Sequence, residues 1–196
     1  MIWLYVGIVF ILFIIYFIAQ NTIKGKLVLA YQKKDYETYY KLLDSTIAKI
    51  SIPAYNLEYM RLNGFIEEGR SEQVDSQLAL LFKARKNKEQ IENLIQISLQ
   101  YYVNLQDSSK CHKLLDYMTS CQMDEQILNE ATYVVDILVD QKTNHIDELE
   151  DKLRTVDEKQ KQVYYYLLQV QYEHVNNIAK ANEYKRLLNL TQNEKN

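Results

Sequence analysis

The chain begins with a long run of apolar residues. From Ile2 to Ala19 it reads IWLYVGIVFILFIIYFIA, eighteen residues without a charge, and the first charged side chain is Lys24. At 1.5 Å per residue, a helix of this length spans roughly 27 Å, close to the hydrocarbon thickness of a bilayer. Aromatic side chains of the kind that favour membrane interfaces lie near its two ends: Trp3, Tyr5 and Tyr16. The pattern predicts a transmembrane helix at residues 1–20.

The residues on either side of this segment predict that it is not cleaved from the protein, and they also predict its orientation in the membrane. A cleaved signal peptide has a basic start, a shorter apolar stretch and a small-x-small cleavage site, and none of these occurs here. Lysines follow the segment but do not precede it: Lys24, Lys26, Lys33 and Lys34. Because cations beside a span resist translocation, we expect a single-pass protein of the cell membrane with its C-terminal domain in the cytosol.

Beyond Asn21, apolar residues recur at helical spacing in segments of roughly 12 to 20 residues, separated by short polar breaks. The breaks lie near residues 33–35, 50–53, 69–71, 84–88, 106–109, 120–124, 142–144, 155–157 and 176–177. Only four Gly and one Pro occur in the chain, too few for the tight turns of a sheet. Pro53 suits the first turn of a helix, Gly69 suits the position after a helix end, and Thr155 with Glu158 predicts a capping box. The sequence therefore predicts an all-α fold of about ten helices joined by short turns.

The soluble part also repeats itself. Phe65, Gly69, Val74 and Leu78 share a pattern with Tyr102, Gln106, Cys111 and Leu115, offset by 37 residues. Weaker copies extend the array, and its packing positions are spaced 38, 37, 35 and 35 residues apart: Tyr36, Val74, Cys111, Ile146 and Ala181. This resembles the tetratricopeptide repeat family, whose unit is a helix pair of about 34 residues. The family's closing Pro is missing, and Glu58 or Ile95 stands where the family has Trp.

The resemblance implies an α-solenoid of about five tetratricopeptide-like helix pairs over residues 21–190, followed by a tail at 191–196. The alternative is an irregular helical bundle whose spacing follows from similar helix lengths. In the family, the inner helix face binds a peptide, and the matching positions of the two clearest repeats are Asn56, Tyr59, Asn63, Glu67, Asn93, Gln96, Gln100 and Asn104. Amides can pair with a peptide backbone, although an ordinary solvated helix face would have the same composition.

The fourth repeat differs, because its corresponding face is apolar throughout. We expect this face to be buried against the chain or a partner: Leu128, Ala131, Val135, Leu138 and Val139.

Charge and chemistry exclude several classes of function. The net charge is −3 with both signs interspersed, so the chain lacks the basic stripe that nucleic-acid binding requires. The three histidines are scattered; His112 has Asp116 one turn on and His145 has Glu148, and neither pair forms a metal motif. Cys111 and Cys121 are expected to be free thiols in the core. We therefore expect that the protein is not an enzyme and that it binds no cofactor, no metal ion and no small-molecule substrate.

Two hypotheses for the function remain. The first is a membrane-anchored scaffold, contacting lipid through its N-terminal helix, that binds a protein or peptide partner at the membrane surface. The second is an accessory subunit or holdase of a membrane complex, similar to tetratricopeptide-bearing companions of the secretion translocon, with its soluble domain outside the cytosol. The side of the membrane distinguishes them.

Overall fold

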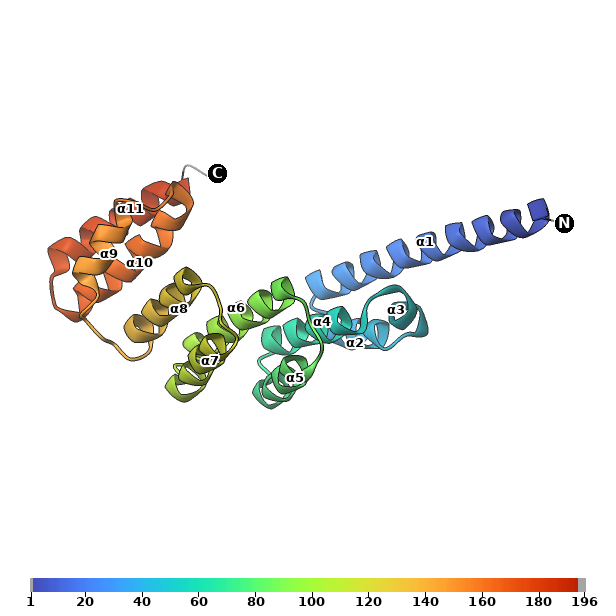
Figure 1. Cartoon of the computed structure of the whole chain (residues 1–196), viewed down its shortest axis with the longest axis horizontal. Helices are drawn as coiled ribbons and strands as arrows, with labels where there is room; N and C mark the ends of the chain where they lie inside the picture. The colour runs from blue at the N-terminus through green and yellow to red at the C-terminus, as the bar shows by residue number, and fades with distance from the viewer. Residues whose placement is uncertain (1, 194–196) are drawn as a thin grey trace. The chain divides into compact units, whose positions relative to one another are not determined.

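A computed structural model describes residues 2–193, apart from the side chains of residues 2–15, 19, 159, 192 and 193. The described residues form eleven α-helices and no strand, so the predicted all-α class is confirmed (Figure 1). Contacts divide the chain into two compact units, Met1–Leu94 and Ile95–Asn196. One helix, α6 (Lys88–Asn104), runs across the boundary.

The first unit contains five helices and the start of α6: α1 (Ile2–Gln32), α2 (Tyr36–Leu43), α3 (Thr46–Ser51), α4 (Ala54–Glu67) and α5 (Ser71–Lys83). Its core includes three residues from the second half of α1, namely Ile23, Leu27 and Ala30, each no more than 6% exposed. They pack against buried residues of α2, α3 and α4. The second half of α1 is therefore part of the folded unit, and no break separates it from the apolar first half.

The second unit contains the rest of α6 and five helices: α7 (Ser108–Ser120), α8 (Glu125–Leu138), α9 (Ile146–Leu153), α10 (Glu158–His174) and α11 (Ile178–Asn193). The apolar face predicted for the fourth repeat lies inward, because Ala131 and Val135 are buried and the other three residues are half-buried. Cys111 is buried as predicted. Cys121 is exposed, so the prediction of a core thiol there is wrong: it directly follows the last residue of α7 and lies off the packed face.

Most of the helix ends follow local capping chemistry. Each predicted break separates two helices, and one further break divides α2 from α3, where the Ser45 hydroxyl accepts a hydrogen bond from the Ala48 N–H at 3.2 Å. The predicted capping box at Thr155 is wrong. Asp157 caps α10 by accepting from the Gln160 N–H at 2.9 Å, whereas the Thr155 hydroxyl donates backward to the Lys152 carbonyl.

The turns between helices repeat a backbone conformation. Among the described turns, Gln122 has a left-handed conformation (φ 51°) and the same type of closing bond, from the Met123 N–H to the Met118 carbonyl at 3.1 Å, outside any regular spacing. The five other left-handed residues, with φ between 55° and 68°, occur at intervals of 35, 37, 35 and 35 residues: Lys34, Gly69, Gln106, Gln141 and Asn176. At four of them, the next N–H donates to the carbonyl five residues back, at 2.8 to 3.0 Å. This is the hydrogen bond that closes a helix end through a left-handed residue. The chain thus repeats one helix-turn-helix connection about every 35 residues.

Candidate functional site

A groove in the first unit lies between α1, α4 and the start of α6, and its volume is about 570 Å³. Its lining combines amide side chains with two tyrosines, three apolar side chains and two charged ones: Lys24, Val28, Ile52, Tyr55, Asn56, Tyr59, Met60, Asn87, Glu89, Gln90 and Asn93. Ile52 is buried beneath it and Met60 is half-buried, so the groove has an apolar floor with polar walls.

Gln90 fixes the wall formed by α6. Its backbone N–H donates to Asn87 Oδ1 at 2.8 Å, and its own Oε1 accepts from the Asn87 N–H at 3.1 Å. This reciprocal pair defines the start of α6 in the manner of a capping box. The Tyr55 hydroxyl donates to the Gln90 carbonyl at 3.0 Å, and Gln90 Nε2 lies 3.4 Å from Asn56 Oδ1. These bonds hold α4 and α6 together along one side of the groove.

Two uncharged polar side chains in the groove, those of Tyr59 and Asn93, remain free to bind a ligand. Among the residues that the structure describes, none is hydrogen-bonded to the Tyr59 hydroxyl or to the Asn93 amide. The Tyr59 ring stacks on Tyr55 with centroids 6.2 Å apart, and burial raises the pKa of Tyr59, which keeps its hydroxyl protonated. A neutral donor and an amide above an apolar floor suit a peptide, which offers backbone amides and apolar side chains.

The structure brings together three of the eight predicted partner-binding residues. Asn56, Tyr59 and Asn93 line the groove. Asn63 and Glu67 lie farther along α4 and outside it. The other three lie on the part of α6 that belongs to the second unit, where they are exposed: Gln96, Gln100 and Asn104. None of the eight is buried, and sequence reasoning missed the contribution of α1, Lys24 and Val28, to the groove.

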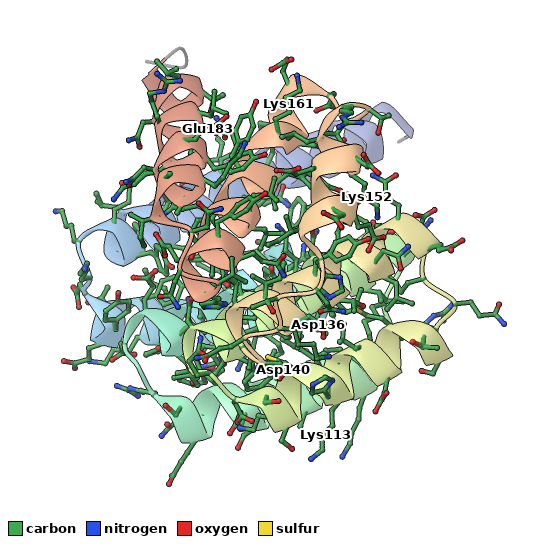
Figure 2. All side chains as sticks on the ribbon, turned by 90° about the vertical axis from the view of Figure 1, so that its left-hand side faces the viewer. Lys113, Asp136, Asp140, Lys152, Lys161 and Glu183 are labelled. Atoms are coloured by element: carbon green, nitrogen blue, oxygen red, sulfur yellow. The ribbon has the colours of Figure 1, made fainter. Side chains whose placement is uncertain are left out.

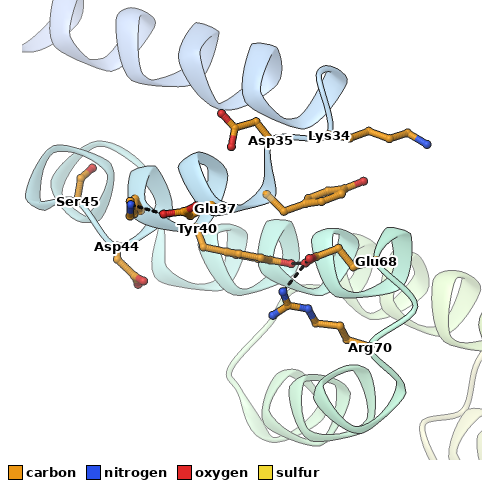
Figure 3. Close-up of a pocket in the computed structure, with 10 residues that line it drawn as sticks. Lys34, Asp35, Glu37, Tyr40, Asp44, Ser45, Glu68 and Arg70 are labelled. Carbon is orange, nitrogen blue, oxygen red and sulfur yellow. Dashed lines mark hydrogen bonds and ion pairs between the residues drawn. The ribbon is translucent and has the colours of Figure 1, made fainter.

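A second hollow of about 770 Å³ lies beside α2 and is lined mainly by charged residues (Figure 3). Its charged groups bind one another. The Tyr40 hydroxyl donates to Glu68 Oε2 at 2.5 Å, and Arg70 Nη2 lies 2.8 Å from Glu68 Oε1. The guanidinium also lies over the Tyr40 ring, 5.6 Å from its centroid. In the larger hollow, the side chains of Tyr40, Glu68 and Arg70 are therefore engaged with one another.

Sequence reasoning also missed a charged network in the second unit (Figure 2). Asp136 is 7% exposed and lies between Lys142 Nζ at 2.7 Å and His145 Nε2 at 2.8 Å. Asp140 accepts from the Ser108 hydroxyl and contacts His112 Nε2, each at 2.8 Å. His112 thus contacts a carboxylate 28 residues away in the sequence, whereas His145 contacts Asp136, nine residues before it, and also Glu148 one turn on at 3.7 Å. The network connects the loop between α8 and α9 to two helices, α7 and α8.

Metal-ligating side chains and the buried thiol bear on the chemistry that the described residues can support. Within them, no group of three or more His, Cys, Asp or Glu side chains is arranged to hold a metal ion. Burial, together with the nearby Asp107 and Asp140 carboxylates, raises the pKa of the Cys111 thiol to about 11. A protonated, buried thiol is a poor nucleophile.

The predicted membrane anchor falls largely outside the described side chains. The side chains of Trp3, Tyr5 and most of the apolar run at residues 2–19 are not among those described. Among the residues that were described, no helix is both long and apolar enough to cross a membrane. Tyr16, Lys24 and Lys26 are described and are exposed on α1.

Comparison with known proteins gave no relative: no family model, no curated protein and no solved structure matches the chain.

Proposed function

We propose that this chain is a membrane-anchored protein-interaction module, in which the groove between α1, α4 and α6 binds an extended segment of a protein partner. The helix pairs would form a tetratricopeptide-like array. The left-handed turns that recur every 35 to 37 residues support that part of the proposal.

The geometry of α1 supports the anchor. The helix is continuous over 31 residues, about 46 Å, and its first eighteen residues are uncharged in the sequence. Its second half packs in the core of the first unit, and Lys24, five residues beyond the apolar run, lines the groove. A partner in the groove would therefore lie close to the membrane surface.

The free polar groups of the groove carry the proposal. Tyr59 and Asn93 present an unbonded hydroxyl and an unbonded amide above Ile52 and Met60. Binding sites are typically concave, mostly apolar, and equipped with a few placed polar groups. Burying such groups without a partner costs free energy, so a peptide that bonds to them is favoured over an apolar ligand.

Photo-crosslinking of the full chain in its native membrane tests this site. p-Benzoylphenylalanine would replace Val28, a 53% exposed residue of the groove wall, in one variant and Val163, a 51% exposed valine of the second unit, in a matched control. We expect a discrete protein adduct from position 28 that is absent from position 163 and is lost when Asn93→Ala is added. Equal adducts at both positions, or an adduct that Asn93→Ala leaves unchanged, would refute the groove as the binding site.

The side of the membrane separates this proposal from a holdase outside the cytosol. Cys121 is exposed and Cys111 is buried, so a membrane-impermeant maleimide reports on Cys121 alone. A cytosolic domain predicts that labelling occurs only after the cells are permeabilised, and that Cys121→Ser abolishes it. Labelling in intact cells would place the domain outside and favour the holdase.

A further inference from the structure

The short helix α3 carries two large apolar side chains on its outer surface. Ile47 is 52% exposed and Ile50 is 67% exposed. Residues three apart in a helix share a face, so the two form one apolar patch. The adjacent face, with Ala48 and Ser51, is buried. The helix is therefore packed on one side and exposes Ile47 and Ile50, together with Thr46 and Lys49, on the other.

The helix that carries this patch lies beside the end of the predicted membrane span. Gln20, the residue directly after the apolar run, donates from Nε2 to the Ser51 carbonyl at 2.9 Å, which ties the end of α3 to α1. In Figure 1, α3 lies at the end of the first unit's body towards which the N-terminal half of α1 extends. Just before Gln20, α1 exposes Phe17 at 55% and Ile18 at 59%.

The charges around the patch suit an anionic surface. Exposed lysines lie on both helices: Lys24 and Lys26 on α1, and Lys49 on α3. Neither α3 nor residues 16–26 of α1 contains an acid. The nearest acid before α3, Asp44, is bound to Arg61 at 2.8 Å. Lysines beside an apolar patch are characteristic of segments that lie at the headgroup level of a bilayer.

We propose that Ile47 and Ile50 insert into the headgroup region of the bilayer, so that α3 is a second membrane contact beside the anchor. This inference rests on the proposed membrane anchor. The occupant is lipid because Gln20, the residue after the apolar run, is bonded to the end of α3, and because α3 and residues 16–26 of α1 carry exposed lysines and no acid. The contact would fix the first unit against the membrane and set the height of the groove above it.

Depth-dependent quenching in proteoliposomes tests the contact. The full chain with Cys121→Ser and Ile50→Cys would be labelled with bimane and reconstituted into phosphatidylcholine vesicles containing phosphatidylglycerol. Leu80→Cys on α5 is the matched control, since Leu80 is 49% exposed. We expect shallow doxyl-labelled lipids to quench the label at position 50 several-fold more than the label at position 80. Circular dichroism would verify that both variants keep the helical content of the parent.

The outcomes separate the two levels of the proposal. If the protein floats with the vesicles but the two labels are quenched equally, the α3 contact is wrong and the anchor stands. If the protein does not float with the vesicles, the anchor and the α3 contact both fall. If the label at position 50 is shielded in a way that depends on protein concentration and not on doxyl lipid, a second copy of the chain covers α3, which overturns the lipid contact.

Discussion

The energetic cost of the recurring left-handed turns can be measured by substituting the residues that adopt the left-handed conformation. Gly69 has φ +68°, and a Cβ added there would meet no heavy atom within 4 Å, so Gly69→Ala carries only a backbone penalty. An L-residue in this conformation costs roughly 1–2 kcal/mol, while the lower entropy of unfolded Ala returns about 0.5–1 kcal/mol. We expect Gly69→Ala to destabilise the protein by about 0.5–1 kcal/mol. Gln141 has φ 56° and is exposed, so Gln141→Gly should stabilise it by a similar amount.

Urea unfolding of the full chain in mild detergent, followed by circular dichroism at 222 nm, measures both changes. With a slope of about 2 kcal/mol per molar urea, the midpoints should move by about 0.3–0.5 M in opposite directions. Ala79→Gly on the exposed side of α5 is the control, and it should cost about 1 kcal/mol because Gly weakens a helix interior. If Gln141→Gly is as destabilising as Ala79→Gly, the reasoning about the turns is refuted.

Three other substitutions probe the packing and the titratable groups. Gly64→Ala should lower the thermal midpoint and cost about 1–2 kcal/mol of stability, because the new Cβ would lie 2.8 Å from the Tyr40 hydroxyl oxygen. In a Tyr40→Phe background the cost of Gly64→Ala should be smaller. An equal cost in both backgrounds would contradict this reasoning. Tyr184→Phe removes a 2.8 Å hydrogen bond that helps hold the pKa of Glu150 below 4.5. This substitution should lower the free energy of unfolding by about 1 kcal/mol above pH 4.5, and the difference from the wild type should become smaller as the pH falls further. The reason is that the wild-type bond favours the ionised carboxylate of Glu150. Urea titrations that gave the same difference at every pH would contradict this. Titration of the folded chain with an aromatic disulfide should detect one reactive thiol, and the Cys121→Ser variant should have none. Two reactive thiols in the folded chain would show that Cys111 is accessible, which would contradict its burial.

The sequence predicted those parts of the fold that depend on neighbouring residues. Helical periodicity predicted the all-α class, and each predicted break separates two helices because caps and left-handed turns are local. The turn at Gly69 and the burial of Cys111 followed from their positions in the repeat. The failures also have local causes: Asp157 is closer to the start of α10 than Thr155 is, and Ser45 supplied a cap that the apolar pattern concealed.

The sequence was less informative about the sites, because they join segments that are distant along the chain. The repeat register selected Asn56, Tyr59 and Asn93, which do lie together in the groove. It could not show that α1 forms another wall, since that depends on how the end of α1 packs on the first unit. Likewise, the Asp140 partner of His112 lies 28 residues away, across a turn whose path the sequence does not specify.

The uninterrupted course of α1 has a consequence for how a partner would be captured. A flexible linker lets a tethered module sweep a volume, and its length then sets the effective concentration of the binding site. Here Leu27 is fully buried in the core, and the same helix continues without a break into the proposed anchor. Encounters would therefore be governed by diffusion within the plane of the bilayer, and only a partner segment presented at the height and tilt of the groove could engage it.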